Sequence, residues 1–161
     1  MIGIAAGNVD GADVTMRNII ISGNTIVAGR ALHQHSGIIA SGNPDRYAYN
    51  IVIADNIVDG YGIVGNDTAG AIHLLETAGV SVTGNAVENF AEAGIVFKHH
   101  NTSFLCSNNL VSSGVSAVQP YGISVVEVVN TGFIVGNRLN DLPIFVRDDP
   151  TNDVIVGDND T

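Results

Sequence analysis

The part of the sequence that could do chemistry is a set of four polar residues that occupy the same position in a repeated segment. Six segments begin with Gly, Ala or Pro followed by Ile, and in four successive ones the fourth residue after that isoleucine is Glu76, His99, Glu127 or Asp148. In neighbouring parallel strands about 4.8 Å apart, Glu76 and Glu127 would lie roughly 10 Å apart with His99 between them. Asp148 would lie roughly 5 Å from Glu127.

These separations bracket the two carboxylate spacings of glycosidases, about 5–5.5 Å in retaining enzymes and about 6.5–9.5 Å in inverting ones. Stacked carboxylates also raise one another's pKa, as a general acid requires. The pattern therefore predicts Glu76 and Glu127 as acid and base on a glycan, with His99 as a third catalytic group.

Cationic residues accompany this row. Lys98 and Arg147 stand three residues after the isoleucine of their segments, and His73 stands one residue after its own. Together with Asp148 they are predicted to bind substrate, since cations pair with the carboxylate of an acidic sugar and a basic group could also serve a lyase. The competing interpretation is ordinary turn chemistry at the ends of strands, with a salt bridge or two.

The elements that must position these residues are short strands. The Gly-Ile segments span residues 3–8, 37–43, 71–76, 94–99, 122–127 and 143–148. Stacked in parallel, they would form an aliphatic ladder of Ile4, Ile38, Ile72, Ile95, Ile123 and Ile144. Apolar stripes at helical spacing do not persist along the chain, and glycine recurs in every window, so helices are not expected.

A second series of strands alternates with the first. It spans residues 19–26, 51–58, 80–87, 103–110, 132–139 and 153–160. Aligned, these segments share a polar column, spaced by 32, 29, 23, 29 and 21 residues, of Asn24, Asn56, Asn85, Asn108, Asn137 and Asp158. In this alignment Leu105, Ile134 and Ile155 continue the inward-facing position. The column is interpreted as a turn residue that tolerates left-handed backbone angles and as a ladder of bonded amides.

The repeat predicts an all-β fold. Two strands in each period and turn residues between them are typical of a right-handed parallel β-helix, a β-solenoid, here of about six coils of 21–32 residues. We expect residues 1–161 to form a single domain, either a segment of a larger protein or one chain of an oligomer.

Charge and cysteine content exclude several classes of function. Six Lys and Arg against sixteen Asp and Glu give a formal charge of −10, which argues against nucleic acid and anionic membranes as partners. The single cysteine, Cys106, excludes an internal disulfide and is expected to be a small buried residue. Residues 1–20 lack the pattern of a signal peptide.

The I-x-I-x-G-N-x-I pattern, followed by a Gly-Ile strand, resembles the β-helix repeats of the pectin-lyase-like superfamily. The resemblance covers nearly the whole chain. It implies a carbohydrate-recognising protein that degrades polysaccharide as a lyase or glycoside hydrolase, with a bacteriophage tailspike or depolymerase as parent. Localisation in a virion or outside the cell and a homotrimer follow from the same comparison. The Asp-Pro-His motif of uronan epimerases and the calcium-plus-arginine set of pectate lyases are absent.

Partners other than polysaccharide are predicted from the ends and the outward positions. An uncovered first strand predicts further β-helix coils of a longer parent or a neighbouring chain. Outward positions of the Gly-Ile strands such as Ile39, Leu75 and Phe145 predict an apolar oligomer interface. The alternative function is a non-catalytic shaft or trimerisation module. No cofactor or metal site is predicted. The alternative is calcium at the C-terminal aspartates, whose spacing matches no calcium loop.

Overall fold

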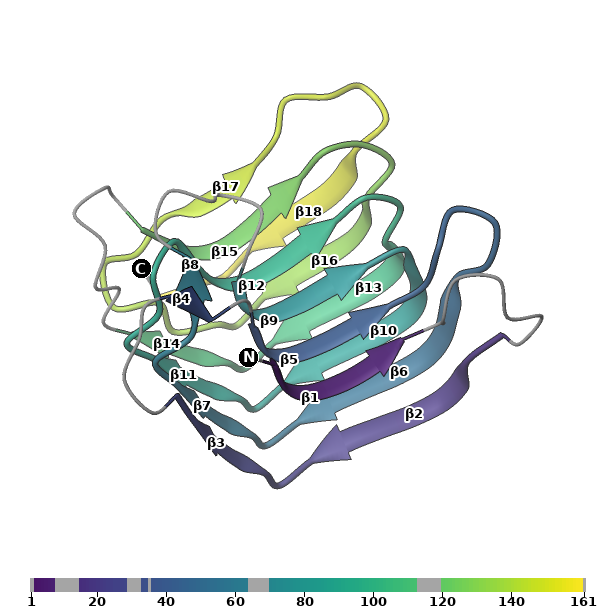
Figure 1. Ribbon diagram of the computed structural model, residues 1–161. Coiled ribbons are helices and arrows are strands. Elements are labelled where there is room, and N and C mark those ends of the chain that lie inside the picture. Colours follow the sequence, from purple (N-terminus) through teal and green to yellow (C-terminus); the bar gives the residue numbers. More distant parts are fainter. Residues whose placement is uncertain are drawn as a thin grey trace.

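The structure is a computed structural model that describes residues 2–7, 15–28, 33–34, 36–63, 70–112 and 120–160. These residues contain eighteen strands and no helix, and hence no helix that could cross a membrane. Sixteen strands form three sheets in which every neighbouring pair is parallel (Figure 1). The prediction of an all-β, parallel architecture is confirmed.

Sheet A consists of the strands of the Gly-Ile segments. In spatial order they are β1 (Ile2–Gly7), β5 (Ser36–Ser41), β9 (Gly70–Leu75), β12 (Ala93–Lys98), β15 (Tyr121–Val126) and β17 (Ile144–Val146). The register aligns all six isoleucines of the predicted ladder. Ile38, Ile72, Ile95 and Ile123 are completely buried, so this ladder is confirmed as the centre of the core.

Sheets B and C complete the architecture. Sheet B contains β2 (Arg17–Ser22), β6 (Ala48–Ala54), β10 (Thr77–Thr83), β13 (Thr102–Ser107), β16 (Thr131–Val135) and β18 (Asp153–Gly157). Sheet C contains β3 (Thr25–Val27), β7 (Ile57–Asp59), β11 (Ala86–Glu88) and β14 (Leu110–Ser112). A small antiparallel pair is formed by β4 (His33–Gln34) and β8 (Gly62–Ile63).

In each of the first four passages the chain visits the sheets in the order A, B, C and then returns to the next strand of sheet A. After β16 it returns to β17 with only an isolated bridge at Arg138 in place of a sheet C strand. One such passage is called a repeat below, and Figure 1 shows the repeats lying one above another. Side chains from the three sheets fill the space between them, where the rings of Phe97 and Phe104 stack at 4.0 Å. Each such buried aromatic or aliphatic side chain contributes about 1.5–3 kcal/mol. Cys106 is fully buried there, as expected, and burial raises the pKa of its thiol far above the usual range.

An asparagine ladder follows the strand of sheet B in every repeat. The backbone N–H and Nδ2 of Asn56 both donate to Oδ1 of Asn85, at 3.1 and 2.9 Å, and Nδ2 also donates to the carbonyl of Ile21 at 2.9 Å. The same pattern links the members of the ladder, Asn24, Asn56, Asn85, Asn109, Asn137 and Asn159. Each buried amide is thus satisfied by the next repeat, and the predicted ladder is confirmed.

Two of its predicted members were wrong by one residue. The ladder contains Asn109 and Asn159, whereas Asn108 and Asp158 precede it, with φ angles of 55° and 45°. Gly23, Asp55, Gly84 and Gly136 stand at the same position, also with positive φ. The left-handed residue is therefore the one before the ladder asparagine, and the asparagine itself serves only the amide ladder.

This shift reverses two side chains. Successive residues of a strand point to opposite faces, so a slip of one residue exchanges inside and outside. Leu105 and Ile155, predicted to face inward, are 40% and 54% exposed, while Ile134 is buried as predicted. Phe104 and Cys106 take the inward positions of β13.

The outer face of sheet A also differs from expectation. Its outward positions were predicted to form an exposed apolar interface. Val96, Ser124 and Val126 are instead buried, and Val96 and Val126 belong to a second apolar cluster that Tyr121 and Phe145 contact. This face is therefore partly covered within the chain, and the well-exposed apolar residues lie on sheets B and C.

Two adjacent asparagines test the ladder with the same substitution. We expect Asn109→Gly to lower the free energy of unfolding by about 1–3 kcal/mol, because it leaves buried N–H and C=O groups of two repeats without partners. We expect Asn108→Gly to change it by less than about 0.5 kcal/mol, because glycine suits a positive φ. Urea denaturation followed by circular dichroism measures both, and equal stability of the two variants would contradict the ladder.

Candidate functional site

Three of the predicted catalytic residues occupy the corner where sheet A ends. Glu76, His99 and Glu127 directly follow β9, β12 and β15, and the register of these strands places them side by side in this order. Glu76 and Glu127 are therefore separated by two strand spacings, about 10 Å along the stack. The predicted row is present.

The backbone at this corner is strained. Glu76, His99 and Glu127 have φ angles of 53°, 47° and 66°, in the left-handed region that disfavours side chains of this size. The corresponding residues at the corner between sheets B and C are Gly, Asp or Asn, which tolerate it. Such a conformation costs on the order of 1–3 kcal/mol per residue and is concentrated at functional sites. The backbone strain therefore makes this corner a candidate site, although other residues outside the row, such as Ser103 and Val129, also have a positive φ.

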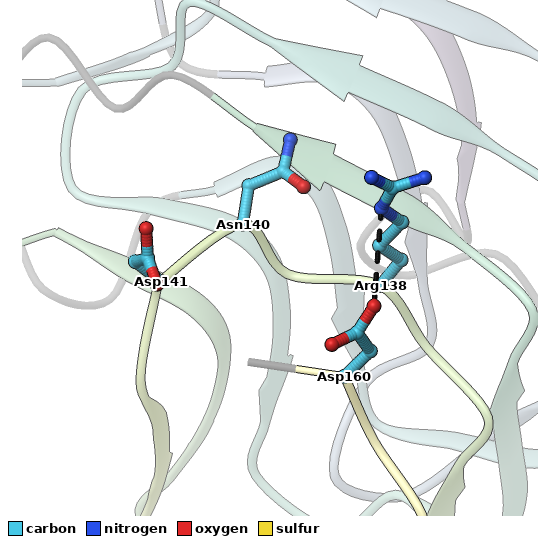
Figure 2. A pocket seen from close by; sticks show the side chains of 4 residues that line it. All are labelled: Arg138, Asn140, Asp141 and Asp160. Carbon is cyan, nitrogen blue, oxygen red and sulfur yellow. Dashed lines mark ion pairs between the residues drawn. The ribbon is translucent and has the colours of Figure 1, made fainter.

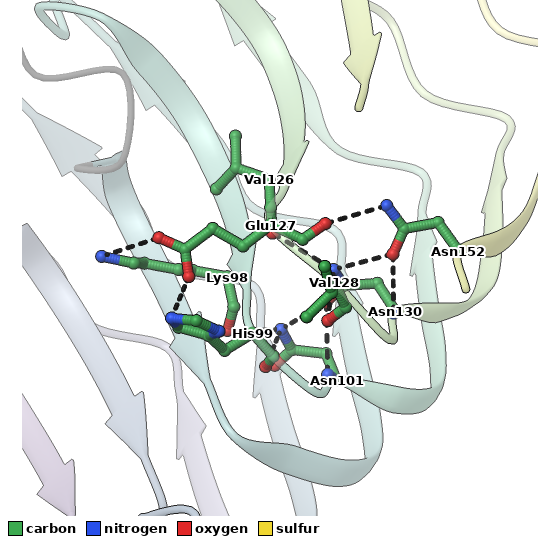
Figure 3. A network of polar contacts seen from close by, with 8 residues as sticks. All are labelled: Lys98, His99, Asn101, Val126, Glu127, Val128, Asn130 and Asn152. Atoms are coloured by element: carbon green, nitrogen blue, oxygen red, sulfur yellow. Dashed lines mark hydrogen bonds and ion pairs between the residues drawn. The ribbon is translucent and has the colours of Figure 1, made fainter. Parts of the chain in front are cut away.

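The side chains form one polar cluster, shown in Figure 3. Lys98 Nζ lies 3.4 Å from Oε1 of Glu127, and His99 Nε2 contacts Oε2 of the same carboxylate. The side chains of Lys98, His99 and Glu127 are 24%, 39% and 21% exposed. Glu127 is thus held between two nitrogen donors at a position that solvent, and a ligand, can reach.

A second asparagine ladder lies directly beneath this cluster. Oδ1 of Asn130 accepts hydrogen bonds from the backbone N–H and Nδ2 of Asn101, at 3.2 and 2.9 Å. Asn130 donates in the same way to Oδ1 of Asn152, at 2.8 and 3.2 Å. Thr77 extends the ladder by donating from Oγ1 to Asn101 at 2.7 Å.

This ladder fixes the backbone of the site residues. Nδ2 of Asn101 donates to the carbonyl oxygens of Lys98 and His99, at 2.8 and 3.0 Å, and Nδ2 of Asn152 donates to that of Glu127 at 3.0 Å (Figure 3). Sequence analysis missed this ladder. Its signal is the Asn-Thr pair that precedes a phenylalanine strand at Asn101 and at Asn130.

Glu76 differs from Glu127 in its surroundings. The residue is only 6% exposed, and its Oε2 makes no hydrogen bond. Burial raises the pKa of Glu76, an effect that His100 and His99 oppose and that Asp45 and Glu127 reinforce. The cluster therefore contains one buried carboxyl whose pKa is raised and a second carboxylate that pairs with Lys98 and contacts His99.

Three neighbours of Glu76 were not predicted as site residues. His100 follows His99 with a φ of 40°, and its ring lies 6.3 Å from that of Tyr47 in an edge-to-face arrangement. Asp45 acts on Glu76 through its charge. Both Asp45 and Tyr47 belong to the connection between β5 and β6, where no periodic pattern marks them.

The remaining predicted substrate-binding residues lie on both sides of the cluster. His73 is half-buried in the middle of β9, in register with Ile39 and Val96. Lys98, the cation of the cluster, is in register with Leu75 of β9. Arg147 and Asp148 follow β17 and are exposed, and the Arg147 N–H donates to the carbonyl of Val125. Arg147 and Asp148 thus extend the row by one strand beyond Glu127.

A shallow polar hollow lies on another side of the molecule. Arg138, Asn140, Asp141 and Asp160 line it, and Arg138 Nε is 3.9 Å from a carboxylate oxygen of Asp160 (Figure 2). Both partners of this ion pair are mostly exposed, so it contributes little to stability. Within the described part of the chain, no group of three or more His, Cys, Asp or Glu side chains is arranged to hold a metal ion.

Comparison with models of protein families, with curated proteins and with solved structures finds no match to this chain. The geometry of the corner is therefore the basis of the functional argument. A protonated Glu76 can donate a proton, Glu127 can accept one, and Lys98 and His99 can bind an anionic group.

The protonation of Glu76 predicts a pH-dependent stability. Because its pKa is raised above 4.5, the folded protein keeps a proton that the unfolded chain has released. Stability from this group is present below pH 4.5 and is lost as the pH rises through the folded pKa. Glu76→Gln, which stays neutral, should therefore be more stable than the wild type at neutral pH and gain nothing in acid.

Urea denaturation across a pH series from acid to neutral measures this difference. Glu88→Gln is the matched control, because Glu88 is exposed on β11, and it should show no such gain. A Glu76→Gln variant that follows the wild type at every pH would contradict the assignment.

Proposed function

We propose that the three sheets form a right-handed parallel β-helix of the type found in the pectin-lyase-like superfamily. The recurring order of sheets, the parallel pairing and the asparagine ladders support it. In such a fold each repeat is one coil, and a row of equivalent positions runs straight along the stack.

The protein is proposed to recognise an acidic polysaccharide along the corner after sheet A. The observation that carries the proposal is the row of Glu76, His99 and Glu127, one from each of three adjacent strands and all in left-handed backbone. The ladder beneath binds the carbonyl oxygens of His99 and Glu127. Lys98 and Arg147 supply positive charge beside it, which suits the carboxylates of uronic acids. A chain of sugars would lie across successive repeats, as an extended ligand fits an extended row.

Glycan cleavage at this corner would use the two glutamates in different roles. Glu76, whose pKa burial raises, donates a proton to the leaving glycosidic oxygen, and Glu127 acts as general base towards water. Two strand spacings of about 10 Å approach the separation of inverting glycosidases and exceed that of retaining ones. Hydrolysis with inversion is therefore favoured over a covalent intermediate.

A virion or extracellular location suits a protein that acts on polysaccharide, and the resemblance to tailspikes supports it. The alternative function is a structural shaft without a substrate. The specific observation in its favour is the exposed apolar column of sheet B, which includes Phe133 and Ile155.

Glycan binding and cleavage test the proposed function. An array of acidic polysaccharides identifies the ligand, and release of reducing ends measures hydrolysis. Glu76→Gln and Glu127→Gln should each lower the cleavage rate by about 100-fold or more, the usual contribution of a general acid or base, with binding retained. Lys98→Ala should weaken binding, because it removes the charge beside Glu127.

Glu88→Gln is again the matched control and should leave both activities unchanged. Full cleavage by both glutamine variants would remove this site. Absence of binding to every glycan on the array would favour the structural shaft.

A further inference from the structure

An unbroken column of outward side chains crosses sheet B from its first strand to its last. The register places in one line Ile20, Val52, Ser81, Leu105, Phe133 and Ile155. Ile20 is 73% exposed and Phe133 is 49% exposed, and Leu105 and Ile155 are similarly open. An apolar column of this length on a sheet is more typical of an interface than of a solvated surface.

Sheet B is almost free of charge. Its six strands contain only two charged residues, Arg17 at the start of β2 and Asp153 at the start of β18. The whole chain carries a net charge of −10. Two copies of so acidic a chain repel each other over most of their surfaces, and sheet B is a face where that repulsion is small.

The face is just large enough for a specific contact. Six strands span about 24 Å across the stack and six residues span about 20 Å along a strand, on the order of 500 Å² per copy. A pair of copies would bury on the order of 1,000 Å², the lower limit for a specific interface.

We propose that this face binds the same face of a second copy of the chain, about a two-fold axis parallel to the strands. Such an axis reverses the order of strands, so that β2 of one copy lies over β18 of the other. Phe133 then faces Val52, and Leu105 faces Ser81, so that each bulky side chain meets a smaller one. Sheets pack in this way about 10 Å apart.

Charge complementarity selects this arrangement. The register aligns Arg17 with Thr102 and Asp153 with Thr131, so the two charged residues lie one residue apart along the strand direction. With β2 over β18, Arg17 of each copy therefore lies beside Asp153 of the other, which makes two opposite-charge contacts per pair. A two-fold axis along the stack would place β2 over β2 and leave both residues opposite uncharged positions. The resemblance to tailspikes predicts three copies, whereas the self-complementarity of this face favours two.

Two exposed leucines of similar accessibility provide the first test. Leu105 on sheet B and Leu110 on sheet C are 40% and 38% exposed. Sedimentation equilibrium should give twice the chain mass for the wild type and for Leu110→Asp. Leu105→Asp should raise the dissociation constant by at least about tenfold, because it places an unpaired charge in the apolar contact.

Circular dichroism and thermal unfolding should be the same for both variants, because both side chains point away from the core. A monomeric wild type, an odd number of copies, or a dimer that Leu105→Asp does not weaken would overturn the proposal.

A charge exchange tests the orientation. Arg17→Asp and Asp153→Arg each create two like-charge contacts per pair and should each weaken the dimer on the order of tenfold. The double variant restores opposite charges across the axis and should recover the wild-type affinity. Single variants that bind as tightly as the wild type, or a double variant weaker than both, would reject this axis.

Discussion

The buried side-chain amide is the interaction on which the rest of this structure depends. An amide of asparagine brings two donors and an oxygen that accepts twice, and leaving any of them unpaired in the interior costs about 1–3 kcal/mol. In this chain the partner is the next asparagine of the same column, so the requirement is met only when the repeats are in exact alignment. Asn56, Asn85 and Asn109 are each less than 2% exposed and fully bonded in this way. The ladders therefore set the register that the aliphatic core alone would leave free to slip.

The same constraint explains how the candidate site keeps its shape. Left-handed backbone at Glu76, His99 and Glu127 is unfavourable by itself, and nothing in those side chains compensates for it. At His99 and Glu127 the ladder of Asn101, Asn130 and Asn152 offsets this cost by donating to their carbonyl oxygens. At Glu76 the backbone N–H of Ala48 donates to the carbonyl. The ionisable side chains of the site therefore stand on backbone that buried hydrogen bonds hold in place.

Much of the fold could be predicted from the sequence, and the errors in the ladder and in the facing of two side chains share one cause. The strands and the isoleucine ladder were predictable, because apolar residues alternate within the strands and each ladder isoleucine follows a Gly, Ala or Pro. In segment 103–110 Asn108 and Asn109 are adjacent, and in the last segment Asp158 precedes Asn159. The residue types alone could not show which residue of each pair joins the amide ladder. Choosing the first of each pair moved Leu105 and Ile155 to the wrong face. The Glu76 row was predictable from spacing, but its burial, and the roles of Asp45 and Tyr47, depend on an irregular connection.

Parallel stacking also limits where charge can lie. Equivalent residues of adjacent strands are about 4.8 Å apart, so a column of like charges is destabilising unless water screens it. At the half-buried corner after sheet A, His99 stands between Glu76 and Glu127 and keeps the two carboxyl groups two strands apart. Where two carboxylates adjoin, as at Asp59 and Glu88 of sheet C, they lie towards solvent, and Asn89 donates to Asp59 at 2.7 Å. Beside Glu127, the next carboxylate of the row, Asp148, is likewise exposed. Since the charged residues of this acidic chain gather at such exposed positions, another face is left nearly neutral. That face is sheet B, which has one charged residue on each of its two edge strands.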